Sequence, residues 1–158
     1  MAIALDDVDL QLLTELQDDA DRPNVELARI VGLSPAATLH RVRRLKESGI
    51  VRAITAQLDA EAAGFPLQVF VSVTLARHDE ASHRRLQRAL HEIPEVIRAD
   101  WVSGETDALL EMVAGSIAEM QRVQNLLASR GGVQRITTLL RMSELKPPSP
   151  LPVGRRRA

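Results

Sequence analysis

Cysteine is absent from the 158 residues of this chain, which excludes disulfides, thiolate chemistry and cysteine-based zinc sites. The first residues, MAIALDDVD, lack the basic and apolar regions of a secretory signal, so none is expected. No apolar run approaches the roughly 20 residues that a helix needs to span a bilayer. We therefore expect a cytoplasmic protein with no membrane partner.

Catalytic constellations are missing as well. The sequence has no Ser/His/Asp set, no phosphate-binding loop and no cluster of ligands with metal spacing. His78, His83 and His91 fall on or near one polar helix and are expected to face solvent. We expect no catalytic residue, no metal and no cofactor, and we set aside the hypothesis of an enzyme built on this chain.

Charge is unevenly distributed although the net charge is only −1. The segment 1–21 contains seven acidic side chains and no basic one, whereas 34–52 contains five basic side chains against one acid. A concentrated basic patch attracts phosphates because the field of a charge is screened within a short distance. A solvated helix face is the alternative interpretation, and the neighbouring motif decides between the two.

Three helices are predicted in the N-terminal third. The first covers 6–17 and is capped by Asp6. The second begins at Asn24, a good N-cap, and ends at Gly32, which tolerates a left-handed conformation. The third is capped by Ser34 and ends at Gly49. Apolar residues at helical spacing are expected to form the core: Leu5, Val8, Leu12, Leu13, Leu16, Leu27, Ala28, Val31, Leu39, Val42 and Leu45.

Two short helices joined by a tight turn with glycine form a helix-turn-helix. An ordinary corner of two helices also uses alanine and glycine at these places. The exposed face of the third helix favours DNA, because small residues at its start permit close approach to base edges and arginines follow them. We therefore predict binding to double-stranded DNA.

Specific roles follow from positions along these helices. The predicted DNA-binding residues are Asn24, Ser34, Ala36, Thr38, His40, Arg41 and Arg44. Arg41 and Arg44 are expected to contact the phosphate backbone, and the residues from Ala36 to His40 are expected to face the bases. Arg43 is expected to lean towards solvent or to pair with Glu47 at i, i+4.

The remainder of the chain predicts the order β-α-β-β-α-β, which is a ferredoxin-like arrangement. A short connecting strand is expected at 53–59 and a hinge at 60–66. The elements of the domain are then strand 67–76, helix 80–93, strands 96–103 and 108–114, helix 117–130 and strand 133–145. The fold class is thus α+β, with a winged-type helix-turn-helix domain (1–52), a linker (53–66), a ferredoxin-like domain (67–145) and a disordered basic tail (146–158).

One face of the predicted sheet is left without helices. It carries Phe70, Leu109 or Leu110, and Ile136 or Leu139, which is too apolar a set to remain in water. We expect this face to pack on a second copy of the chain. A dimer suits a helix-turn-helix because two copies read two half-sites.

Four segments resemble the Lrp/AsnC (feast/famine) regulators. They are L-D-x-x-D-x-x-L-L from Leu5, N-V-E-L-A-R-I-V-G-L-S from Asn24, R-V-R-R-L-K-E-S-G-I from Arg41 and V-S-G-E-T-D-A-L-L from Val102. The resemblance extends from about Leu5 to Leu145. It implies a regulator whose dimers assemble into tetramers or octamers and whose C-terminal domain binds a small molecule, usually an amino acid, between dimers.

The resemblance also implies the effector-binding positions, which are Gly104, Thr106, Asp107, Ile136 and Thr138. Two of them depart from the family, which has a bulky or aromatic residue at the position of Thr106 and a threonine at that of Ile136. These changes favour a more apolar ligand or an empty pocket. From the residues alone, Gly104 and Asp107 fit plain turn chemistry equally well.

Two functions remain open at this point. The first is a sequence-specific, nucleoid-associated transcriptional regulator switched by a small molecule. The second is an architectural protein that wraps DNA with little ligand control. Relative affinity for specific and random DNA distinguishes them.

Overall fold

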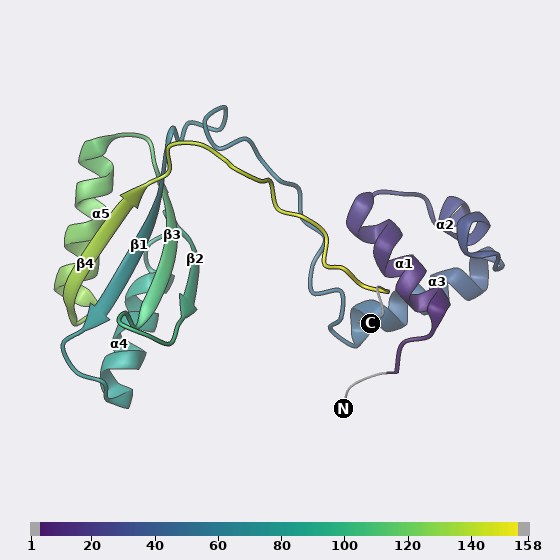
Figure 1. Ribbon diagram of the computed structural model, residues 1–158, viewed down its shortest axis with the longest axis horizontal. Helices are drawn as coiled ribbons and strands as arrows, with labels where there is room; N and C mark the ends of the chain where they lie inside the picture. The colour runs from purple at the N-terminus through teal and green to yellow at the C-terminus, as the bar shows by residue number, and fades with distance from the viewer. Residues whose placement is uncertain (1–3, 155–158) are drawn as a thin grey trace. The chain divides into compact units, whose positions relative to one another are not determined.

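The computed structural model describes residues 4–154, which form two compact units. Residues 4–56 and 146–154 group together, and residues 57–145 form the second unit. The first unit is helical and the second combines a sheet with helices (Figure 1). The predicted α+β fold class is confirmed.

The N-terminal unit contains α1 (Asp7–Asp18), α2 (Asn24–Val31) and α3 (Pro35–Glu47). Asp6 caps α1 as predicted: its carboxylate accepts the Asp9 N–H at 2.8 Å, and the Asp9 carboxylate accepts the Asp6 N–H at 3.2 Å. Gly32 ends α2 with a φ of 69°, a left-handed conformation that favours glycine. The core consists of Leu12, Leu13, Leu27, Val42 and Leu45.

Two predictions for these helices are wrong. Asn24 is the first residue of α2 and not its cap, because Pro23 occupies the cap position and makes no side-chain bond there. Leu39 is exposed, whereas its neighbour Thr38 is fully buried. A shift of one residue turns a helix position by about 100°, so the buried stripe of α3 is Thr38, Val42 and Leu45.

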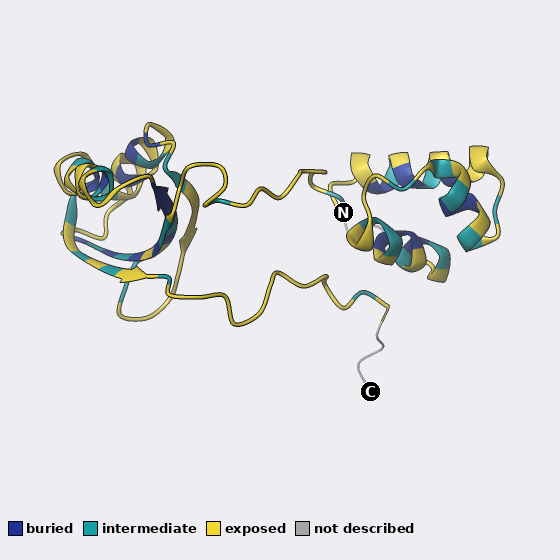
Figure 2. Cartoon of the chain, turned by 90° about the horizontal axis from the view of Figure 1, so that it is seen from above, coloured by how far each residue is buried: buried dark blue, intermediate teal, exposed yellow. Residues whose placement is uncertain are grey.

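The C-terminal unit contains a four-stranded antiparallel sheet in the order β2-β3-β1-β4. The strands are β1 (Leu67–Leu75), β2 (Val96–Trp101), β3 (Ala108–Ala114) and β4 (Val133–Leu140). Helices α4 (Glu80–His91) and α5 (Ile117–Arg130) cover one face of it (Figure 2). The alternating apolar residues of β1 are buried there against residues of both helices, as the sequence predicted.

Two expected strand segments do not form. Residues 53–59 are not a strand, and a turn closed by the Ala63 N–H donating to the Asp59 carbonyl at 2.9 Å follows them. The last strand ends at Leu140 and does not continue to Leu145. The reason is the length of its neighbour: β1 begins at Leu67, so the chain beyond Arg141 has no strand with which to pair.

Part of the tail contacts the helices of the N-terminal unit. The Leu151 N–H donates to the Gln17 side-chain carbonyl at 2.7 Å, and the Gln17 amide donates to the Leu151 carbonyl at 3.2 Å. Val153 packs against the core of the three helices. We call residues 151–153 the C-terminal strap. The arginines 155–157 of the expected basic tail lie outside the described residues.

Candidate DNA-binding and effector-binding sites

Helix α3 presents one stripe of exposed side chains on the side opposite its buried stripe. The exposed stripe consists of Ala36, His40, Arg43 and Glu47. The spacing of three to four residues places these side chains on one face of the helix. Ala37 is also exposed, so the start of α3 carries only small side chains.

Thr38 is wrong as a base-facing residue. It is fully buried, and its hydroxyl donates to the Ser34 carbonyl at 3.1 Å. A buried hydroxyl needs such a partner. Ser34 caps α3 as predicted, since its Oγ accepts the Ala37 N–H at 3.2 Å.

Asn24 joins the beginnings of α2 and α3. Its Nδ2 donates to the Pro35 carbonyl at 2.8 Å, and the side chain is half-buried. This bond fixes how the two helices of the helix-turn-helix meet. Its predicted contact with DNA stays a prediction.

An ion-pair cluster holds α3 against α1. The carboxylate of Asp9, whose side chain is 1% exposed, accepts from Arg41 at 2.9 Å and also pairs with Arg44. Arg41 additionally donates to Asp6 at 2.7 Å. We call these four residues the Asp9 cluster. It occupies the two guanidinium groups that the sequence assigned to phosphates.

The cluster favours the charged forms of Asp6 and Arg41. The Asp9 N–H and the Arg41 guanidinium hold the pKa of Asp6 below its usual range. Hydrogen bonds to Asp6 and Asp9 raise the pKa of Arg41. A phosphate that contacted Arg41 or Arg44 would compete with carboxylates already in place. The predicted contacts of both arginines with the DNA backbone stay predictions.

The loop between β2 and β3 contains three of the predicted effector-binding residues. Gly104 has a φ of 129°, which favours glycine. Thr106 donates to the Val73 carbonyl at 2.8 Å, and the Asp107 carboxylate accepts the Leu75 N–H at 2.7 Å. Both side chains thus fasten the loop to β1, and their predicted contact with an effector stays a prediction. The second Asp107 oxygen faces His78 Nδ1 at 3.1 Å.

The other two predicted effector-binding residues lie on β4. Val73 of β1 pairs with Ile136 of β4 on one side and, on the other side, with Ala108, which directly follows the loop. Ile136 and the end of the loop are therefore about two strand spacings, ~10 Å, apart. Ile136 packs against the core. Thr138 accepts a hydrogen bond from Gln124 of α5 at 2.9 Å, a partner that sequence spacing did not indicate. The five residues lie towards one end of the sheet.

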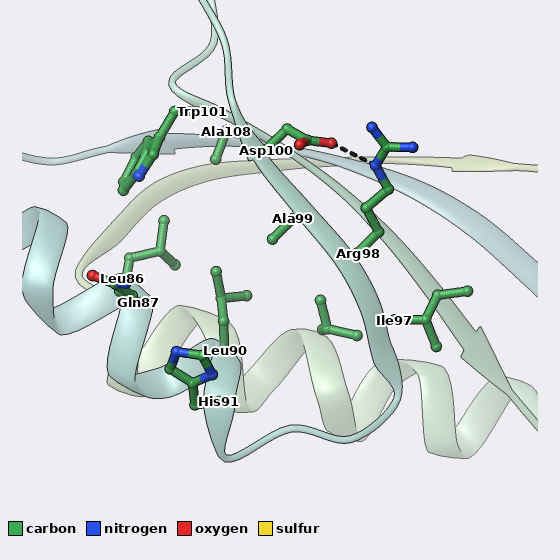
Figure 3. Close-up of a pocket in the computed structure, with 11 residues that line it drawn as sticks. Leu86, Gln87, Leu90, His91, Ile97, Arg98, Ala99, Asp100, Trp101 and Ala108 are labelled. Carbon is green, nitrogen blue, oxygen red and sulfur yellow. Dashed lines mark hydrogen bonds and ion pairs between the residues drawn. The ribbon is translucent and has the colours of Figure 1, made fainter. Parts of the chain in front are cut away.

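A separate groove of about 390 Å³ lies between α4 and the edge strand β2 (Figure 3). Leu86, Leu90 and Trp101 form its apolar wall, with His91 at its rim. Trp101 also packs against His83, with ring centroids 4.8 Å apart. None of the five predicted effector-binding residues lines this groove.

The open face of the sheet carries an exposed apolar cluster: Phe70 at 38%, Leu109 at 40% and Leu139 at 58% exposure. Phe70 and Leu139 are directly paired between β1 and β4. The alternatives Leu110 and Ile136 are wrong for this face, because both belong to the opposite, helix-covered side. An Arg98–Asp100 ion pair of 2.7 Å lies on β2 at the rim of this cluster.

Two family models match the chain. One, described as winged helix-turn-helix DNA-binding, matches residues 5–52, and the other, described as Lrp/AsnC ligand binding domain, matches residues 68–151. None of the helices described here has the length and apolar character needed to cross a bilayer.

Similar proteins with regulatory functions match this chain over almost its full length. A leucine-responsive regulatory protein of Rhizobium meliloti is 38% identical, covering 91% of this chain and 93% of its own length. A glutamate uptake regulatory protein of Zymomonas mobilis is 33% identical, covering 94% of this chain and 91% of its own length.

The solved structure of a Neisseria meningitidis transcriptional regulator in complex with L-Met has a TM-score of 0.87 and 32% identity, covering 94% of this chain and 97% of its own. An AsnC family regulator from Agrobacterium tumefaciens has a TM-score of 0.84 at 29% identity, with the same coverage. The chain therefore belongs to the Lrp/AsnC family of transcriptional regulators, with an N-terminal helix-turn-helix domain that binds DNA and a C-terminal ligand-binding domain.

Proposed function

We propose that this protein acts on chromosomal DNA in the cytoplasm as a homodimer, or as a tetramer or octamer of such dimers. Each protomer contributes α3 to one half-site, and a small molecule such as an amino acid, bound in the C-terminal domain, changes DNA binding. The observation that carries the proposal is the exposed start of α3. There, Ala36 and Ala37 leave room for base edges in front of a packed three-helix core.

Dimerisation is supported by the apolar cluster of the open sheet face. Apolar side chains at its centre and charged side chains at its rim are the pattern of a protein interface. A two-fold pair of chains would cover the same three side chains on both copies.

DNA binding is tested with two duplexes of equal length, one from directly upstream of the gene that encodes this chain and one of random sequence. We expect the upstream duplex to bind at least about a thousandfold more tightly at physiological salt, which is the lower end for specific binders. Fluorescence anisotropy at several salt concentrations measures both affinities. Equal affinities would contradict sequence-specific regulation and support the architectural alternative.

Ligand binding is tested by thermal shift with the twenty amino acids as separate probes. We expect at least one to raise the unfolding temperature, since a ligand at a hundred times its Kd adds about 2.7 kcal/mol to the free energy of unfolding. Asp107→Asn should abolish this shift, because an amide still accepts the Leu75 N–H but lacks the charge that would hold a ligand's ammonium group.

Glu105→Gln serves as the matched control, since Glu105 is an exposed carboxylate in the same loop. It should leave the shift intact. If Asp107→Asn also keeps the full shift, the loop from Gly104 to Asp107 is not the effector site.

A further inference from the structure

The three arginines of α3 differ in whether their guanidinium groups are paired with carboxylates. Arg41 and Arg44 are held by the Asp9 cluster on the side that faces α1. Arg43 lies on the exposed stripe, one turn after His40. Within residues 4–154 it forms no ion pair. Of the two placements expected for Arg43, leaning towards solvent or pairing with Glu47, the structure shows the exposed one.

The exposed stripe therefore offers a single guanidinium fork to a partner of α3. Small side chains at Ala36 and Ala37 let the start of the helix approach closely, so a long side chain further along can reach base edges. Ala36 and Arg43 lie about 10 Å apart along the helix axis, which is the length of roughly three stacked base pairs. Both therefore fit within one half-site.

We infer that Arg43 is a specificity-determining residue, whose guanidinium reads a guanine edge in the major groove. The inference rests on the proposed function, in which α3 enters that groove. The five N–H donors of arginine match the O6 and N7 acceptors of guanine in a bidentate pair, which no shorter side chain of this stripe provides. Arg41 and Arg44 become positioning residues, which set the angle of α3 on α1.

The test compares the wild type with Arg43→Ala by selecting bound duplexes from a pool of random sequences. We expect the wild type to select a G·C pair in each half-site and Arg43→Ala to lose this one preference while keeping the others. Affinity of the variant for the selected duplex should fall about 5- to 150-fold, as expected for losing a bidentate base contact. Affinity for a random duplex should change little.

Lys46→Ala is the matched control, because Lys46 is an exposed cation on the same helix but outside the exposed stripe. It should keep every base preference. The unfolding temperatures of both variants should match that of the wild type, since neither side chain contributes to the core.

Two results overturn the inference. One is an Arg43→Ala variant with unchanged base preferences. The other is an equal loss of affinity for selected and random duplexes, which would make Arg43 a phosphate contact only. A wild-type protein that selects no sequence at all would overturn the proposed sequence specificity together with the role of Arg43, so the two failures are distinguishable.

Discussion

Asp9→Ala is expected to lower the free energy of unfolding of the N-terminal unit by about 2 to 3 kcal/mol. Removal of the carboxylate leaves Arg41 and Arg44 side by side without the acceptor they share. Breaking a fully buried pair costs about 3 to 5 kcal/mol. We place the effect below that range because both arginine side chains keep partial access to water. The variant also loses the Asp9 half of the capping box at Asp6.

Urea denaturation followed by far-ultraviolet circular dichroism measures this loss. Asp7→Ala is the matched control, because Asp7 has the same charge in the same first turn of α1 but is exposed. It should cost only a few tenths of a kcal/mol. If the two variants unfold at the same urea concentration, the Asp9 cluster does not stabilise the unit.

Phe70→Asp is expected to convert the proposed dimer into monomers, with the dimer Kd raised at least about a hundredfold. In a two-fold interface the substitution is present twice, and each new carboxylate would be desolvated beside Leu139 and Leu109. The cation at the rim, Arg98, is already paired with Asp100. A loss of about 3 kcal/mol corresponds to that factor, and central aromatic residues commonly contribute this much. Because Phe70 is more than one-third exposed in the single chain, the protomer itself should still fold.

Sedimentation velocity across a dilution series measures the change, and DNA affinity should fall with it because a monomer contacts one half-site only. Ile117→Asp is the control, since Ile117 is an exposed apolar residue at the start of α5, away from the open sheet face. It should remain dimeric. A Phe70→Asp variant that stays dimeric at the same concentrations would show that the open sheet face is not the interface.

Periodicity and capping chemistry predicted most of this fold from the sequence. The alternating apolar residues of β1 and the caps Asp6 and Ser34 are local signals, and the structure confirms each of them. The prediction was wrong where a single residue determines which face of a helix is buried. Thr38 carries a hydroxyl and was expected to face outward, but its bond to the Ser34 carbonyl allows it to be buried.

The candidate sites could be predicted only in part, because their contacts join residues that are distant in sequence. Asp9 meets Arg41 and Arg44 across 32 and 35 positions, and nothing local reveals which arginines of α3 are engaged. The same holds for the strap: its composition does not indicate the hydrogen bonds that Leu151 makes with Gln17, which lies 134 positions earlier. Charge and composition indicate what a segment can bind, but tertiary packing decides which partner it meets.

The C-terminal strap has a consequence for biosynthesis. Gln17 leaves the ribosome long before Leu151, with 134 positions between them, which at 5 to 20 residues per second is a delay of roughly 7 to 27 s. During that interval the three helices must persist with the surface of α1 around Leu10 uncovered. The DNA-binding unit is therefore completed only after the ligand-binding domain has been synthesised. A gene fragment that stops at residue 56 would produce the helix-turn-helix without the packing of Val153 against its core.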